Sequence, residues 1–114
     1  MSPEVNRKLQ LEQELRRLTE IIIREYKPQR MILFGSLAQG KVHEWSDIDL
    51  VIVKDTPKQF LERMQEIFLL THPTVTLNVV VYTPSEVIEM EKQKHYFWKD
   101  EIVAKGKVLY DRAA

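Results

Sequence analysis

Hydrophobic and polar residues alternate along the chain in patterns that predict both helices and strands. In the first segment, four apolar residues recur at helical spacing with charged residues between them. These residues are Leu11, Leu15, Leu18 and Ile22. Ser2 can cap such a helix and Pro3 suits its first turn, so we expect a helix that ends before Pro28.

Three apolar runs predict β-strands: Met31–Phe34, Leu50–Val53 and Val75–Tyr82. The third run is rich in β-branched residues, and its continuous apolar part favours a central strand. Asn78 interrupts this run. Because an amide in such a strand needs hydrogen-bond partners or a ligand, Asn78 is a candidate functional residue.

Two further helices are predicted around the third strand. Thr56 and Pro57 open the first of them, His72 closes it, and its apolar residues form one stripe that we expect in the core. The stripe consists of Phe60, Leu61, Met64, Ile67 and Phe68. Residues 83–86, Thr-Pro-Ser-Glu, are a capping box that starts the second helix.

The second helix is expected to run into residues 92–99, where basic and aromatic side chains are interleaved. Two interpretations of this segment stay open. Either it binds a base or RNA, or the aromatic rings pack in the core while the lysines are solvated. A final helix is expected to end near Gly106, before a short strand at Val108–Tyr110.

Composition limits the class of protein. The 114 residues are expected to form one domain, residues 1–114, without room for a separate acceptor-binding domain. With 17 basic and 17 acidic residues, the chain has no net charge to attract a long nucleic acid. The lack of cysteine excludes disulfides and thiolate metal sites and fits the cytoplasm, which is the expected location. We expect neither a membrane-spanning segment nor a signal peptide.

The strongest chemical pattern is Gly35-Ser36, followed after ten residues by Asp47-Ile48-Asp49. Alternate residues of a strand project from one face, so the two carboxylates would lie about 6.5–7 Å apart along the backbone. One divalent ion fits between them, and Mg²⁺ or Mn²⁺ suits oxygen ligands best. Taken alone, Asp-x-Asp is more often a solvated strand end or a helix cap. The preceding glycine, which lets a ligand approach the backbone, and the serine hydroxyl favour a phosphate site.

The loop between these residues contains further candidates. Residues 35–41 satisfy the G-x-x-x-x-G-K part of the P-loop pattern, but Val42 lacks the hydroxyl that a P-loop needs next. We therefore interpret Lys41 as a loop cation that contacts phosphate or stays solvated at the surface. Trp45 either stacks on a base or anchors the loop. Ser46 is a further candidate nucleotide contact.

The Gly-Ser, ten-residue, Asp-x-Asp spacing resembles the signature of the minimal nucleotidyltransferases, the MNT proteins of the DNA polymerase β superfamily. Residues 102–110 are similar to the usual end of these short domains, so the likeness spans about residues 31–111. The resemblance implies an α/β (α+β) fold in which a small mixed β-sheet is flanked by helices, as in the polymerase β palm.

By the same resemblance, Gly35 and Ser36 bind a triphosphate, while Asp47 and Asp49 hold two Mg²⁺ ions. The position of the family's third carboxylate is occupied by Asn78, which offers a carbonyl oxygen without charge or basicity. A neutral ligand weakens one of the ions and leaves the attacking hydroxyl less activated. We therefore expect Asn78 to affect turnover more than it affects nucleotide binding. Arginines that often follow Gly-Ser in the family are also absent.

Three functions stay open. One is an enzyme that binds ATP or another NTP with Mg²⁺ and moves an NMP group, AMP in the case of ATP, to a hydroxyl. Another is an MNT antitoxin that neutralises a HEPN-type RNase toxin by contact or by adenylylation, a partner that the resemblance implies. The third is a catalytically weak or inactive protein that senses nucleotide. Assembly into a homo-oligomer also stays open.

Overall fold

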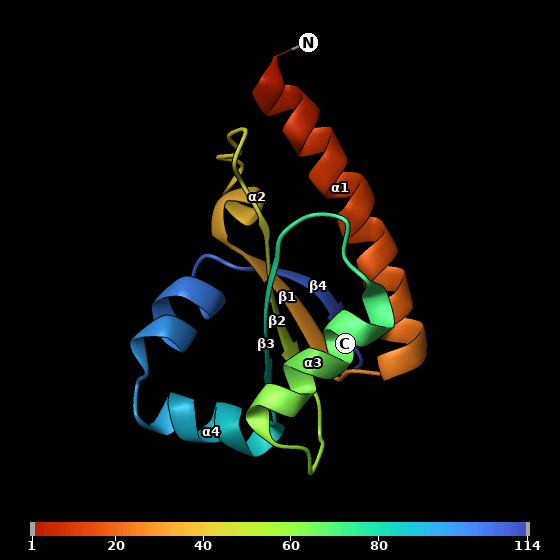
Figure 1. Cartoon of the computed structure of the whole chain (residues 1–114). Coiled ribbons are helices and arrows are strands. Elements are labelled where there is room, and N and C mark those ends of the chain that lie inside the picture. The colour runs from red at the N-terminus through yellow and green to blue at the C-terminus, as the bar shows by residue number, and fades with distance from the viewer. Residues whose placement is uncertain (1, 114) are drawn as a thin grey trace.

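A sheet of four strands runs through the middle of the structure, with helices on both sides (Figure 1). The computed structural model describes residues 2–113. In chain order the elements are α1 (Pro3–Ile21), η1 (Ile22–Tyr26), β1 (Arg30–Phe34), α2 (Gly35–Gln39), β2 (Ile48–Val53), α3 (Phe60–Thr71), β3 (Leu77–Tyr82), α4 (Pro84–Lys92), η2 (Phe97–Val103) and β4 (Lys107–Asp111). The segments η1 and η2 are π-helical. No helix within residues 2–113 combines the length and the apolar character needed to cross a membrane.

The strand order is β3-β2-β1-β4, with β2 parallel to β3 and the other two pairs antiparallel. This mixed sheet flanked by helices confirms the expected fold class. The expectation that residues 75–82 form a central strand is wrong, because β3 lies at an edge of the sheet. The apolar run of β3 is explained by burial of its faces and not by a central place in the sheet. Leu77, Val79 and Val81 are buried on one face, and two side chains on the other face are half-buried.

Successive side chains of the strands point to opposite faces of the sheet, and each face packs against its own layer of helices. In β2, Leu50 and Ile52 pack with residues of α1, η1 and α3, whereas Val51 and Val53 pack with residues of α4 and η2. Figure 1 shows the sheet between these layers, with α1 and α3 on one side and α4 on the other. Asp49 is two residues before Val51 and four before Val53, so its side chain lies on the same face, the α4 side of the sheet.

The first helix agrees with the prediction. The hydroxyl of Ser2 accepts a hydrogen bond from the backbone N–H of Val5 at 3.2 Å, and Pro3 begins the helix. Helical structure continues through η1 to Tyr26, and Lys27 ends it in the left-handed conformation, with φ 54°. The helix therefore ends before residue 28, as expected.

A buried acid on α1 holds the loop that leads into β3. Glu14 accepts hydrogen bonds from Arg17 at 2.7 and 2.9 Å and from the backbone N–H of Thr74 at 2.6 Å. Arg17 also donates to the carbonyl oxygen of His72. The Arg17 hydrogen bond, opposed by burial and assisted by Thr74, lowers the pKa of Glu14 from 4.5 to about 2. Through these contacts α1 fixes the entry to the strand that carries Asn78.

The start of α3 differs from the prediction. The helix begins at Phe60 and not at Thr56 and Pro57. The hydroxyl of Thr56 accepts a hydrogen bond from the N–H of Lys58, which holds these residues in a local turn. A threonine and a proline before an apolar run therefore mark a turn here, and the helix starts about one turn later.

The apolar stripe of α3 is only partly in the core, contrary to expectation. Ile67 is fully buried, but three members of the stripe are exposed: Phe60, Leu61 and Phe68. The buried positions of the helix are Arg63, Ile67 and Thr71. Because polar side chains with internal hydrogen bonds take two of these positions, the apolar pattern alone does not identify the buried face.

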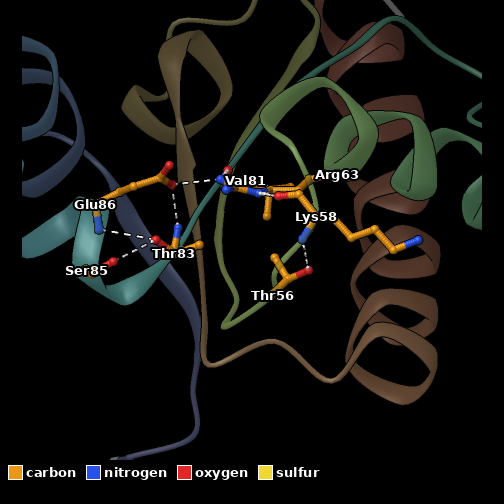
Figure 2. A network of polar contacts seen from close by, with 7 residues as sticks. All are labelled: Thr56, Lys58, Arg63, Val81, Thr83, Ser85 and Glu86. Carbon is orange, nitrogen blue, oxygen red and sulfur yellow. Dashed lines mark hydrogen bonds and ion pairs between the residues drawn. The ribbon is translucent and has the colours of Figure 1, made fainter.

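Arg63 ties α3 to the end of β3 and the start of α4, as Figure 2 shows. Its guanidinium donates hydrogen bonds to the carbonyl oxygens of Lys58 at 2.8 Å and Val81 at 3.1 Å, and to the carboxylate of Glu86 at 2.7 Å. The same carboxylate accepts from the N–H of Thr83, whose hydroxyl accepts from the N–H of Glu86. This confirms the predicted capping box. The hydrogen bond from Arg63 to Val81 also covers part of the exposed edge of β3.

The helix expected to continue into residues 92–99 is interrupted. α4 ends at Lys92, and Lys94 turns the chain in the left-handed conformation, with φ 53°. Trp98 in η2 is 2% exposed and packs edge-to-face on Tyr82 at 6.2 Å. These contacts favour the packing interpretation for this aromatic side chain. β4 follows close to the predicted final strand.

Candidate functional site

The end of β1 places Gly35 directly beside Asp49. Phe34 pairs with Asp49 in the antiparallel register, and Gly35 follows in the left-handed conformation, with φ 76°. A Cβ atom added at Gly35 would overlap Oδ2 of Asp49. The sequence pattern indicated a ligand close to this glycine, and the structure adds the neighbouring carboxylate as a second reason for it.

Asp49 also faces Asn78 across the parallel pair of β2 and β3. The two residues are register partners, and Nδ2 of Asn78 donates a hydrogen bond to Oδ1 of Asp49 at 2.9 Å. Asp47 lies just before β2 begins at Ile48, and it is half-buried. Three segments that are far apart in the sequence therefore meet at one end of the sheet. They bring together Gly35, the two aspartates and the asparagine.

The electrostatic surroundings of Asp49 favour a cation. Burial raises the pKa of Asp49, the hydrogen bond from Asn78 opposes this effect, and the charge of Asp47 raises the pKa further. Within residues 2–113, neither aspartate forms an ion pair with a basic side chain. Two adjacent carboxylates without a cationic partner are an environment that a metal ion stabilises.

The donor atoms at this end of the sheet fit a hard divalent ion. Asp47 and Asp49 supply carboxylate oxygens, and the carbonyl oxygen of Asn78 stays available because its amide nitrogen makes the bond to Asp49. Oxygen-only ligands suit Mg²⁺. In the described part of the chain, no group of three or more histidine, cysteine or acidic side chains is placed to hold a metal. A metal site here would therefore rest on two carboxylates and a neutral amide.

Ser36 and Ser46 join the two ends of the loop that separates Gly35 from the aspartates. The hydroxyl of Ser36 donates to that of Ser46 at 3.0 Å, and the backbone N–H of His43 donates to the same oxygen at 2.9 Å. Ser46 is buried, with 3% of its surface exposed. Its hydroxyl is engaged inside the loop, where it positions Ser36.

Sequence reasoning missed Arg7, which reaches this loop from α1. Its Nε donates a hydrogen bond to the carbonyl oxygen of Ser46 at 2.9 Å, across 39 positions of sequence. Arg7 lies four residues before Leu11, on the face of α1 that is buried, but a charged side chain in the second turn of a helix is usually interpreted as solvated. Only knowledge of the contact between α1 and the loop would have identified it.

Two other residues predicted in the loop point to solvent. Lys41 is exposed, and its side chain makes no hydrogen bond or ion pair within residues 2–113, although its backbone N–H donates to the carbonyl oxygen of Ser36 at 2.9 Å. Trp45 is 76% exposed. Its ring therefore does not anchor the loop by packing, and it is accessible for stacking.

The chain belongs to the polymerase β nucleotidyltransferase family. The sequence profile of that family matches residues 13–114, which include every candidate site residue except Arg7. No curated protein sequence matches the chain significantly.

Solved structures support the same fold. A protein from Sulfolobus solfataricus, provisionally described as a nucleotidyltransferase, is similar over 99% of this chain and 91% of its own length. The TM-score is 0.68 at 16% sequence identity, so the likeness establishes the fold and not the activity.

Proposed function

We propose that the chain binds a nucleoside triphosphate with Mg²⁺ at the end of the sheet where Gly35, Asp47 and Asp49 meet. The observation that carries this proposal is the half-buried carboxylate of Asp49, which lies against a glycine and beside a second carboxylate, without an ion pair in residues 2–113. The Mg²⁺ that accompanies a triphosphate would supply the positive charge that the carboxylates need. Membership of the nucleotidyltransferase family supports the same ligand.

The proposed reaction transfers a nucleotidyl group, AMP when ATP is the donor, to a hydroxyl. The hydroxyl oxygen forms a bond to the α-phosphorus, the bond from that phosphorus to the oxygen bridging to the β-phosphate breaks, and pyrophosphate leaves. The hydroxyl proton passes to solvent. Bound Mg²⁺ neutralises phosphate charge and favours deprotonation of the hydroxyl. Asp47 and Asp49 would hold the ion. The hydroxyl of Ser36, which donates to Ser46 in this structure, would turn its one hydrogen from Ser46 to a phosphate oxygen.

For the acceptor, we propose a hydroxyl on a HEPN-type partner protein, with the chain acting as the antitoxin of the pair. The resemblance to MNT proteins motivates this partner. Exposed apolar side chains on α3, among them Leu61 and Leu69 at 68% and 72%, support binding to another protein. A cytoplasmic location, action as one domain over residues 1–114 and self-association stay predictions.

A second candidate function is favoured by Asn78. Its amide donates to Asp49, so a neutral group occupies the place where a third carboxylate would assist deprotonation of the acceptor. In this alternative the chain binds nucleotide and neutralises its partner by contact, with weak or no transfer. Both functions use the same nucleotide site and differ in whether the partner becomes modified.

The test is incubation of the full chain with α-labelled ATP, Mg²⁺ and the protein encoded by the adjacent open reading frame, which we expect to be of the HEPN type. Transfer predicts a labelled partner, no label with the Asp47→Asn, Asp49→Asn double variant, and full label with Asp55→Asn. Asp55 is an exposed aspartate beyond the end of β2 and serves as the matched control. A stable complex that never acquires label would establish the contact function. Equal labelling by the double variant and the wild type would refute the site.

A further inference from the structure

A cavity opens on the α4 side of the sheet, at the opposite end of β1 from Asp49. Its volume is about 480 Å³, which is within the range of small-molecule sites, about 300–1,000 Å³. Arg30, the first residue of β1, lines it, whereas Asp49 pairs with Phe34 at the other end of the strand. The four residue steps between these positions separate the two places by about 13 Å along the strand.

Three cationic side chains from different elements line this cavity. Arg30 comes from β1, Lys94 from the turn after α4, and Lys99 from η2. Within residues 2–113, none of these side chains makes a hydrogen bond or an ion pair. Among the described residues, Glu91 is the one acidic residue of the lining. The cavity is therefore locally cationic in a chain of zero formal net charge.

Arg30 carries the strongest indication of a ligand. It is half-buried, and its guanidinium lies over the ring of Trp98 at 5.5 Å from the centroid. Stacking on a ring leaves the N–H donors at the rim of a guanidinium free, and donors removed from water need acceptors. An anion with several oxygens would satisfy these donors and those of the two lysines together.

The rest of the lining is apolar. Trp98 is 2% exposed, and Met90 and Val103 line the same cavity. A ligand that fits both parts would place charged oxygens near the cations and a flat apolar group along these side chains. Inorganic phosphate alone would contact only the cationic side chains of the cavity.

We propose that this cavity binds a small phosphate ester whose organic part is flat and apolar. The oxygens of the phosphate contact Arg30, Lys94 and Lys99, and the organic part contacts Trp98 and Met90. The site is separate from the aspartates and requires no metal ion. It therefore stands or falls independently of the proposed nucleotidyl transfer.

The test uses the indole N–H resonance of Trp98 in the full chain, with phenyl phosphate as the probe. The chain has two tryptophans, so Trp45→Phe assigns the resonance. In EDTA, which removes divalent ions, phenyl phosphate is expected to shift the Trp98 signal with saturation. Benzyl alcohol, a neutral aromatic molecule, is expected to leave it unmoved, and inorganic phosphate is expected to bind more weakly.

Charge variants at the lining give opposite expectations. Lys99→Gln should weaken phenyl phosphate about fivefold or more through the lost attraction, and Glu91→Gln should tighten it through relieved repulsion. Lys107→Gln, the same change at an exposed lysine of β4, should leave the affinity unchanged. No saturable shift, equal binding of benzyl alcohol, or equal effects of Lys99→Gln and Lys107→Gln would overturn the proposal. Unchanged binding in Asp49→Asn would show that the two sites are independent.

Discussion

The amide of Asn78 donates a 2.9 Å hydrogen bond to the carboxylate of Asp49 across two parallel strands. This contact opposes the effect of burial, which raises the pKa of Asp49. At this position the amide lets Asp49 ionise without a third carboxylate beside it and Asp47. Because Asn78 stands where the family has a third carboxylate, the site also lacks a charge that would help to hold a second metal ion. We therefore predict that this pair supports nucleotide binding more than catalysis.

Asn78→Asp tests this balance. Without metal, the new carboxylate should repel Asp49 and lower the melting temperature, because like charges at one site oppose each other's ionisation. With Mg²⁺ the repulsion is relieved, so the melting temperature should rise more than in the wild type. Gln65→Glu, an amide-to-acid change on the exposed face of α3, is the matched control and should show no added response to Mg²⁺. Identical Mg²⁺ responses in both variants would contradict the metal assignment.

The two left-handed glycines give a paired test of the close approach at Asp49. Gly40→Ala should cost about 1–2 kcal/mol, because its φ is 71° but nothing obstructs the new methyl group. Gly35→Ala has the same backbone penalty and forces Asp49 to turn away from Asn78. We expect about 0.5–1.5 kcal/mol more from the lost hydrogen bond. Urea unfolding measures both, and equal costs would show that the approach is unimportant.

Local signals predicted the elements that depend on neighbours in sequence. Ser2 and Pro3 start the first helix, which ends before Pro28 as predicted, and the capping box at Thr83 and Glu86 starts α4. These features need only hydrogen bonds within one turn. They could therefore be recognised without knowledge of the fold.

Long-range packing decided the features that the sequence did not reveal. The apolar run of β3 does not show that the strand lies at the edge of the sheet, where Arg63 donates a hydrogen bond to the carbonyl oxygen of Val81. The apolar stripe of α3 does not show that Phe60 and Leu61 stay exposed. At the site, the spacing from Gly35-Ser36 to Asp47 and Asp49 predicted the candidate phosphate and metal ligands. The contact from Arg7 to Ser46 could not be predicted, because it depends on where α1 lies.

The Glu14 contacts predict a pH dependence of stability. The folded pKa of about 2 is below the ordinary value of 4.5, so the contribution is complete above about pH 4.5 and is lost as pH falls toward 2. Glu14→Gln should cost about 1–3 kcal/mol at pH 7 and flatten this acid dependence. Glu12→Gln, which removes an exposed acid 3.9 Å from Lys8, should cost under about 0.5 kcal/mol. Equal acid sensitivity in Glu14→Gln and wild type would disprove the assignment.

Ser46→Ala tests the support of the loop. The change leaves the N–H of His43 without its buried acceptor and frees the hydroxyl of Ser36. We expect a loss of about 1–3 kcal/mol in the free energy of unfolding and weaker ATP binding. Ser85→Ala removes an exposed hydroxyl whose one hydrogen bond within residues 2–113 joins it to Thr83, and it should change stability by under about 0.5 kcal/mol. ATP affinity equal to that of the wild type in Ser46→Ala would separate the loop from the nucleotide site.

The central claim is that Asp47 and Asp49 bind a metal-dependent triphosphate. Calorimetric titration of the full chain with ATP, with and without Mg²⁺, tests it most directly. We predict binding that requires Mg²⁺, is abolished in the Asp47→Asn, Asp49→Asn double variant, and is retained in Asp55→Asn. Binding of equal affinity in the double variant and the wild type would contradict the account.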